Sequence, residues 1–297
     1  GTYTGVFADA NVGTNKTVTI TPTYSGADVG NYSVTDQSTA TGNIVAKTLT
    51  ATASASNKVY DATNSATTSL TLSGLIGTET LTTSNTSTFN NKNVGTGKTV
   101  TVNSITLANG SNGGLAANYS ISPGQTTTAH ISKKLLTVSS ISASNKAYDG
   151  NAIATSTITL SGFVGSETLT SSNLSSFNNK NVGTGKTVTV NSITLANGTN
   201  GGLANNYSIS SGQTTTANIT AKSLTVSGIT ASDKTYDGST SATMDGTSAV
   251  YSGLVSGDTL TGTYSGVFDN ANVGTGKTVT ITSSYGGTDV NNYTITD

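Results

Sequence analysis

The stretch that decides the fold reads FNNKNVGTGKTVTVNSITLANG. It occupies residues 89–110, and residues 177–198 repeat it without a change. Identity over 22 residues suggests recent duplication of one unit. The chain therefore contains internal repeats, and its fold has to be interpreted repeat by repeat.

Thr and Val alternate in this stretch from Thr99 to Val102, as expected for a β-strand that buries one face. The apolar positions then move from even to odd numbers, at Ile105 and Leu107. A shift of one residue turns every later side chain to the opposite face of a sheet. The sequence therefore predicts a β-bulge or a strand break near residues 103–104.

Two other markers, a Tyr-Asp pair and an Asn-Tyr pair, recur at intervals of about 88 residues. The Val-Gly-Thr-x-Lys-Thr-Val turn within the stretch also occurs four times, beginning at Val12, Val94, Val182 and Val273. We infer four copies: the C-terminal part of a repeat at residues 1–46, complete repeats at 47–133 and 134–221, and a repeat that lacks its last strand at 222–297. Because the chain starts and stops inside a copy, we expect it to be an excerpt from a longer array.

Enrichment in Thr, Val, Ile and Tyr, without helical apolar spacing, predicts an all-β fold. We expect about seven short strands in each copy, arranged as a small β-sandwich-like domain. In the second copy they should include residues 48–53, 66–72, 79–82, 119–121 and 126–131. The joins contain no Pro and keep a strand-like pattern, so the tandem array should form an elongated rod.

The chain has 13 Lys, no Arg, 14 acidic residues and a formal net charge of -1. A nearly neutral chain without guanidinium groups is a poor partner for nucleic acid. The absence of Cys excludes thiol chemistry and disulfides, and a single His leaves no multi-histidine metal site. We expect no transmembrane segment, since no apolar run approaches roughly 18 residues, and we recognise no signal peptide.

A Lys-x-Tyr-Asp element is the most distinctive local motif. Lys and Asp at this spacing could form a catalytic pair, but no nucleophile or His recurs with them. In the structural interpretation, Tyr packs its ring in the core with its hydroxyl hydrogen-bonded, and Asp organises the following turn. We favour that interpretation and predict no enzymatic activity. The motif residues are Lys58, Tyr60, Asp61, Lys146, Tyr148, Asp149, Lys234, Tyr236 and Asp237.

Residues 95–99, Gly-Thr-Gly-Lys-Thr, resemble the end of a phosphate-binding loop. That loop needs another Gly where Lys92 stands, and a helix where this chain has an alternating strand, so a tight turn is the better interpretation. His130 occurs once and its counterpart is Asn218, so we expect no shared ligand or base there. We predict no cofactor. Calcium between copies stays an alternative, although its acidic loop pattern is absent.

The motifs Lys-x-Tyr-Asp-Gly, Phe-x-Asn/Asp-x-x-Val-Gly-x-x-Lys-x-Val and Asn-Tyr-x-Ile together resemble the YDG-type repeat domains of very large bacterial surface and secreted proteins. Many of these are adhesins of the filamentous-haemagglutinin kind. The resemblance covers all four copies, although the first begins after the Tyr-Asp-Gly part and the second has Ala62 in place of Gly. It implies export to the bacterial cell surface and service as stalk modules, and it transfers no catalytic or ligand residue.

We therefore expect non-catalytic stalk or spacer repeats in an extended cell-surface adhesin or surface filament. The alternative is a multivalent binding module, in which each copy contacts glycans, matrix or neighbouring chains directly. An ice- or crystal-binding surface fits less well, because each copy presents only one short row of Thr. The expected partners are neighbouring repeats, with other copies in a filament or host-surface ligands as further options. Unpaired strand edges at the two ends could also be completed by strand addition from another chain.

Overall fold

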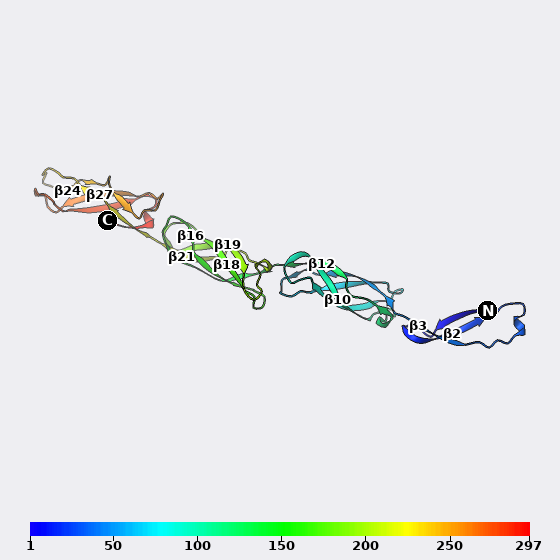
Figure 1. The fold of residues 1–297 in the computed structure, drawn as a ribbon. Helices are drawn as coiled ribbons and strands as arrows, with labels where there is room; N and C mark the ends of the chain where they lie inside the picture. The colour runs from blue at the N-terminus through cyan, green and yellow to red at the C-terminus, as the bar shows by residue number, and fades with distance from the viewer. The chain divides into compact units, whose positions relative to one another are not determined.

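The computed structural model describes all 297 residues and divides into two compact units, Gly1–Lys134 and Leu135–Asp297. Each unit holds two of the four copies, which are numbered repeats 1 to 4 along the chain and follow the colour order of Figure 1. Regular structure consists of strands and of four 3-10 turns with three residues each. The all-β prediction is therefore confirmed. No helix in the chain has the length and apolar composition that crossing a membrane requires.

The first unit combines a small sheet with a larger two-layer repeat. Repeat 1 is a three-stranded antiparallel sheet in the order β1-β2-β3. Repeat 2 has a five-stranded sheet, β6-β12-β10-β9-β7, and the two-stranded sheet β5-β8 lies against its strands β12 and β9. The strands are β1 (Thr2–Phe7), β2 (Gly13–Thr23), β3 (Thr39–Ile44), β4 (Lys47–Thr48), β5 (Thr50–Ala55), β6 (Lys58–Val59), β7 (Ser65–Ala66), β8 (Thr68–Ser73), β9 (Leu81–Phe89), β10 (Gly95–Asn109), β11 (Tyr119–Ser120) and β12 (Thr126–Ser132).

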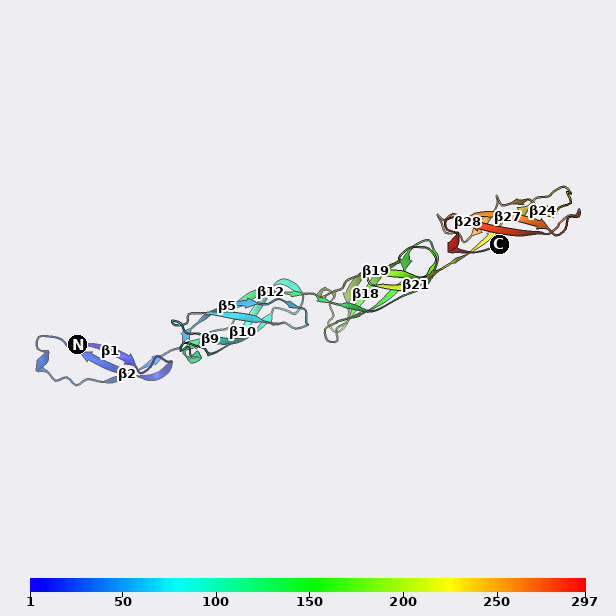
Figure 2. The ribbon, with the colours of Figure 1, turned by 180° about the vertical axis from the view of Figure 1, so that it is seen from behind.

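The second unit repeats this architecture and then changes it. Repeat 3 has the five-stranded sheet β15-β21-β19-β18-β16 and the pair β14-β17, whereas repeat 4 has the smaller sheets β24-β27-β28, β26-β22-β29 and β23-β25, some of which Figure 2 labels. The strands are β13 (Lys134–Leu135), β14 (Thr137–Ala143), β15 (Lys146–Ala147), β16 (Ile153–Ala154), β17 (Ser156–Ser161), β18 (Leu169–Phe177), β19 (Gly183–Asn197), β20 (Tyr207–Ser208), β21 (Thr214–Thr220), β22 (Lys222–Ser227), β23 (Thr230–Ala231), β24 (Ser241–Ala242), β25 (Met244–Asp245), β26 (Val250–Ser252), β27 (Thr261–Phe268), β28 (Val279–Gly286) and β29 (Tyr293–Thr296).

The Thr-Val alternation builds the core of the two complete repeats. Val100 and Val102 on β10 are fully buried, and the last strand, β12, adds Ala129 and Ile131. Repeat 3 buries the corresponding residues of β19 and β21. Because these strands pair antiparallel, the small and the branched side chains of the last strand close one edge of each core.

The predicted irregularity near residues 103–104 is confirmed as a β-bulge. β10 runs without a break from Gly95 to Asn109, but its register against β9 shifts between Val102 and Ser104. The strand therefore stays continuous while its apolar face changes sides.

The strand count differs from the expected seven. Repeat 2 has five strands of at least six residues, together with the two-residue strands β4, β6, β7 and β11. Residues 48–53 and 66–72 were each expected to be one strand, yet each is divided between two sheets. β9 is also longer than the four residues expected at 79–82. Its inward face carries polar residues between Leu81 and the buried Phe89, and Thr68 donates a hydrogen bond to Asn85 there at 2.6 Å, so apolar alternation does not reveal the strand.

Candidate functional site at the junction of successive repeats

The Lys and Asp of the Lys-x-Tyr-Asp motif form an ion pair in all three copies. The distances between Lys Nζ and Asp Oδ1 are 2.8, 2.7 and 2.9 Å in repeats 2, 3 and 4. Each Asp also accepts a backbone hydrogen bond from the residue two positions later, as Asp149 does from Asn151 at 3.1 Å. Each Lys lies over a Phe ring at 5.7 to 5.9 Å. The pair therefore fixes the turn after the tyrosine. Its residues are Lys58, Asp61, Lys146, Asp149, Lys234 and Asp237.

The tyrosine of the motif behaves differently from copy to copy. Tyr60 and Tyr148 are 1% exposed, as expected for core residues, but Tyr236 in repeat 4 is 64% exposed. Tyr148 is buried by both repeats, because its core cluster contains residues of its own repeat, such as Phe177, together with Leu224 and Tyr293 of repeat 4. Burial of this side chain is therefore a property of two repeats together.

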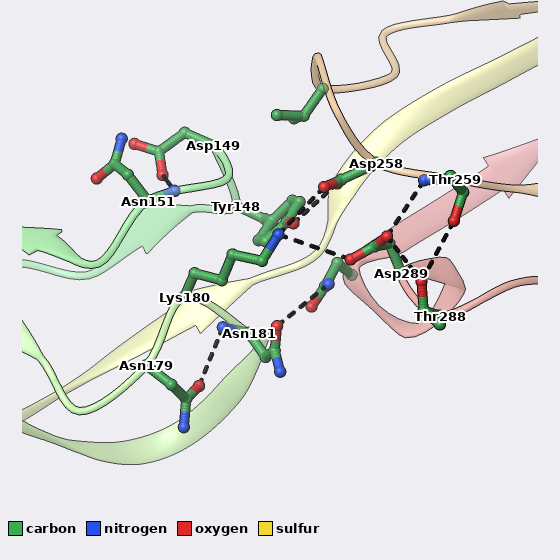
Figure 3. Close-up of polar contacts among 12 residues, drawn as sticks. Tyr148, Asp149, Asn151, Asn179, Lys180, Asn181, Asp258, Thr259, Thr288 and Asp289 are labelled. Atoms are coloured by element: carbon green, nitrogen blue, oxygen red, sulfur yellow. Dashed lines mark hydrogen bonds and ion pairs between the residues drawn. The ribbon is translucent and has the colours of Figure 1, made fainter.

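A buried carboxylate of repeat 4 receives Tyr148 (Figure 3). The Tyr148 hydroxyl donates to Asp258 Oδ2 at 2.8 Å, and the Tyr293 hydroxyl donates to the same oxygen at 2.6 Å. The two rings meet edge to face, with centroids 5.6 Å apart. Lys180 Nζ lies 3.2 Å from Asp258 Oδ1 and 3.7 Å from Asp289. Two tyrosines and one lysine thus contact the Asp258 carboxylate. Tyr148 and Lys180 come from repeat 3, and Asp258, Asp289 and Tyr293 come from repeat 4.

An asparagine adds a backbone contact to the same junction. Asn292 Oδ1 accepts a hydrogen bond from the Val182 amide at 2.9 Å. In the first unit, Asn118 of repeat 2 accepts from Val12 of repeat 1, also at 2.9 Å. Asn118 then donates to Asn11 at 3.1 Å. The Asn of the Asn-Tyr pair is therefore a junction residue in both units.

In repeats 2, 3 and 4, the Tyr of the Asn-Tyr pair donates a hydrogen bond to a carboxylate. Tyr119 donates to Glu79 in repeat 2, and Tyr207 donates to Glu167 at 2.6 Å in repeat 3. The sequence interpretation missed these acids because it tested acidic residues only as calcium ligands or catalytic groups. A signal was present, since each acid precedes a Thr-Leu pair, at Glu79, Glu167 and Asp258.

Burial and hydrogen bonding shift the ionisation of the junction. Burial raises the pKa of Asp258, but hydrogen bonds from Tyr293, Tyr148 and Lys180 outweigh burial and leave that pKa below its ordinary value. Burial, followed by the bond to this carboxylate, raises the pKa of Tyr293 to about 12 and also raises the pKa of Tyr148. Contacts with Tyr148 and then Asp258 raise the pKa of Lys180. At neutral pH, Asp258 and Lys180 are therefore charged, and the hydroxyls of Tyr148 and Tyr293 are protonated.

We expect the junction to lose stability at both ends of the pH scale. A lowered carboxyl pKa gives stability that is complete above about pH 4 and is lost as the pH falls further. Raised Tyr and Lys pKa values give stability that is complete below about pH 10 and is lost as the pH rises through the folded values. The measurement is the difference in unfolding free energy between the wild type and Asp258→Ala at pH 3, 7 and 11. A difference that is equal at all three values would contradict this assignment.

Gly150 lies against the next repeat, and Gly238 is its matched control. Both have positive φ, 80° and 79°. A Cβ at Gly150 would lie 2.6 Å from Val255 Cγ1 of repeat 4, whereas a Cβ at Gly238 would meet nothing within 4 Å. Both Ala variants should therefore carry the conformational cost of about 1–2 kcal/mol, and Gly150→Ala should lose about 1–3 kcal/mol more. Urea unfolding measures the loss of stability of each variant. Equal losses for the two variants would show that the Val255 side chain moves aside without a cost in free energy.

The turn that resembles a phosphate-binding loop uses its glycine for backbone geometry. Gly97 and Gly185 have φ of 58° and 60°, which supports the tight-turn interpretation. The amide of Gly97 donates to His130 Nδ1 at 2.8 Å, and the amide of Gly185 donates to Asn218 Oδ1 at 2.8 Å. His130 and Asn218 thus have one shared role as acceptors for this turn. No group of three or more His, Cys, Asp or Glu side chains is placed to hold a metal ion.

A model of the YDG domain family matches residues 1–41, 45–129, 132–217 and 220–297. The chain belongs to the YDG domain family. No curated protein and no solved structure is similar enough to count as a match. Four tandem YDG domains therefore cover almost the whole chain. The tyrosine of the family motif is the residue that reaches from YDG repeat 3 into YDG repeat 4.

Proposed function

We propose that these YDG repeats are non-catalytic structural spacers in an extended adhesin or filament on the bacterial cell surface. The observation that carries the proposal is the junction between repeats 3 and 4, where the Asp258 carboxylate binds Tyr148 and Lys180 of the preceding repeat. A spacer must transmit orientation from one domain to the next. A buried, multiply hydrogen-bonded contact does so because each bond fixes a direction as well as a distance.

The core supports this role. Tyr148 and Tyr293 lie in one cluster of buried apolar residues that extends from repeat 3 into repeat 4. The two domains are thus joined by packing as well as by the covalent chain, in contrast to a flexible linker. In the first unit, the bond from Val12 to Asn118 reproduces, between repeats 1 and 2, one element of the contact between repeats 3 and 4. We infer that each of these pairs of repeats is stiff and that export places the array outside the cell.

Small-angle scattering of the whole chain, with glycan binding as a second readout, tests the proposed function. A spacer should give one extended particle whose maximum dimension is unchanged between low and high salt, and no glycan on an array should bind above background. The distribution of a freely jointed chain would contradict stiffness. Saturable glycan binding that maps to equivalent residues in each repeat would favour the multivalent binding module.

The calcium expectation has its own test. Melting in a chelator and in added Ca²⁺ should give the same Tm if the junction residues alone set the stability. A Tm that falls in the chelator and recovers with Ca²⁺ would assign the ion a structural role.

A further inference from the structure

In each complete repeat, the first and last segments of the chain are paired with each other and run in the same direction. In repeat 2, β4 pairs parallel with β11, and β6 pairs parallel with the last strand, β12. In repeat 3, β15 pairs in the same way with its last strand, β21. The segment through which the chain enters each repeat is thus bonded to the segment through which it leaves. The entering segments are residues 47–60 and 135–148, and the leaving segments are residues 119–132 and 207–220.

Three hydrogen bonds join these two segments in the same way in both repeats. In repeat 2 they run from the amides of Leu49, Tyr60 and His130 to Ser120 O, Ser132 O and Asn57 Oδ1, at 2.8, 2.9 and 2.7 Å. In repeat 3 they run from the amides of Leu136, Tyr148 and Asn218 to Ser208 O, Thr220 O and Asn145 Oδ1, at the same three distances. The bonds therefore belong to the repeat architecture and not to one copy.

The last strand lies inside its sheet and not at an edge. β12 has β6 on one side and β10 on the other, and β21 lies in the same way between β15 and β19. β5 also lies against β12 (Figure 2). Leu49 and Ile131 are 3% and 1% exposed, so water has little access to the backbone bonds beside them. Removal of the last strand therefore requires bonds to break on both of its sides.

We propose that each complete repeat is a mechanical clamp that resists tension applied along the chain. Tension draws the entering segment toward the N-terminus and the leaving segment toward the C-terminus. Because the two segments run parallel, tension slides them past each other along their length, and the bonds between them are loaded together. Bonds that are loaded from one end, as when one strand is peeled from another, break one at a time. Unfolding under tension is slow because several bonds must break in one step.

The clamp goes beyond the proposed spacer function. A spacer needs a fixed orientation between repeats, whereas the clamp acts within one repeat and keeps it folded under load. An array that is stiff in scattering but whose repeats unfold easily under tension would keep the spacer and lose the clamp. A flexible array of mechanically strong repeats would do the reverse.

The direction of pulling tests the clamp. The chain has no Cys, so two introduced Cys residues carry the only handles for optical tweezers. The pair Val45→Cys and Lys133→Cys pulls repeat 2 along the chain. The pair Thr96→Cys and Lys133→Cys pulls β10 and β12 apart at one end, where Gly95 faces Ile131. All three handle positions are exposed.

At one constant force, repeat 2 should unfold at least about 30-fold more slowly with the first pair of handles than with the second. The reason is that at least two further hydrogen bonds must break in the same step. Equal unfolding rates in the two directions, or faster unfolding along the chain, would overturn the proposal.

Asn57→Ala removes one bond of the clamp, the bond that Asn57 accepts from the His130 amide. With the first pair of handles, this variant should unfold about 3- to 10-fold faster at constant force. Asn103→Ala is the matched control, because Asn103 donates to Thr88 at 3.0 Å between β10 and β9, outside the loaded segments. Its rate should stay within about 2-fold of the unchanged repeat. Equal acceleration by the two variants would contradict the clamp, and if Asn57→Ala unfolds repeat 2 without force, the two pulling directions alone decide the outcome.

Discussion

Tyr148→Ala should lower the free energy of unfolding of the second unit by about 3–5 kcal/mol. The variant removes a ring that is 1% exposed from a core shared by two repeats, and it also removes one of the hydrogen bonds to Asp258. The loss should appear in urea denaturation. In peptide-resolved hydrogen exchange it should appear as faster exchange on both sides of the junction, in β15 and in β29.

Tyr236→Ala is the matched control, because it changes the same motif position in repeat 4. Tyr236 is 64% exposed, so its loss should stay within about 1 kcal/mol. Tyr148→Phe separates packing from hydrogen bonding and should lose about 1–2 kcal/mol through its hydroxyl alone. Equal effects of Tyr148→Ala and Tyr236→Ala would mean that the tyrosine acts within its own repeat.

Asp258→Ala should cost about 3 kcal/mol, nearly as much as the removal of the ring. The variant leaves the hydroxyls of Tyr148 and Tyr293 without their acceptor, and Lys180 without its closer carboxylate. A buried donor that loses its partner retains its desolvation cost, which is why the effect exceeds that of an ordinary hydrogen bond. Thermal unfolding followed by circular dichroism checks the loss.

Asp269→Asn is the control for the loss of one negative charge in the same repeat. Asp269 forms a surface ion pair with Lys277 at 3.2 Å, and its side chain is 49% exposed. Repeats 2 and 3 carry Asn at this position, so the substitution should change stability by less than about 0.5 kcal/mol. A loss as large as that of Asp258→Ala would point to net charge rather than to the buried contact.

Periodicity was sufficient to predict the class of fold and its finest irregularity. The change of phase between Val102 and Ile105 is a local property of one strand, so it predicted the bulge that the register shows. β9 was harder to recognise because its inward face carries Asn85 and Ser87, which bond to Thr68. An interior of paired hydroxyl and amide groups has no apolar signature in the sequence.

The junction could not be predicted from the sequence because its partners lie far apart in the chain. Tyr148 and Asp258 are separated by 110 residues and belong to different repeats. The recurrence of a tyrosine within each copy suggests a role within each copy, and only the fold shows that Tyr148 packs on the next repeat. The ion pair of Lys146 and Asp149 lies three residues apart, so local spacing was enough to associate those two residues.

A distance distribution between repeats 3 and 4 tests the central claim most directly. The chain has no Cys, so spin labels at Ser172→Cys and Ser265→Cys, both on exposed strand positions, are the only labels present. Pulsed electron–electron double resonance should give a single narrow distribution of label-to-label distances in this background and with Asp269→Asn. With Tyr148→Ala the distribution should be broad. A broad distribution in the otherwise unchanged chain would contradict a junction that fixes one repeat on the next.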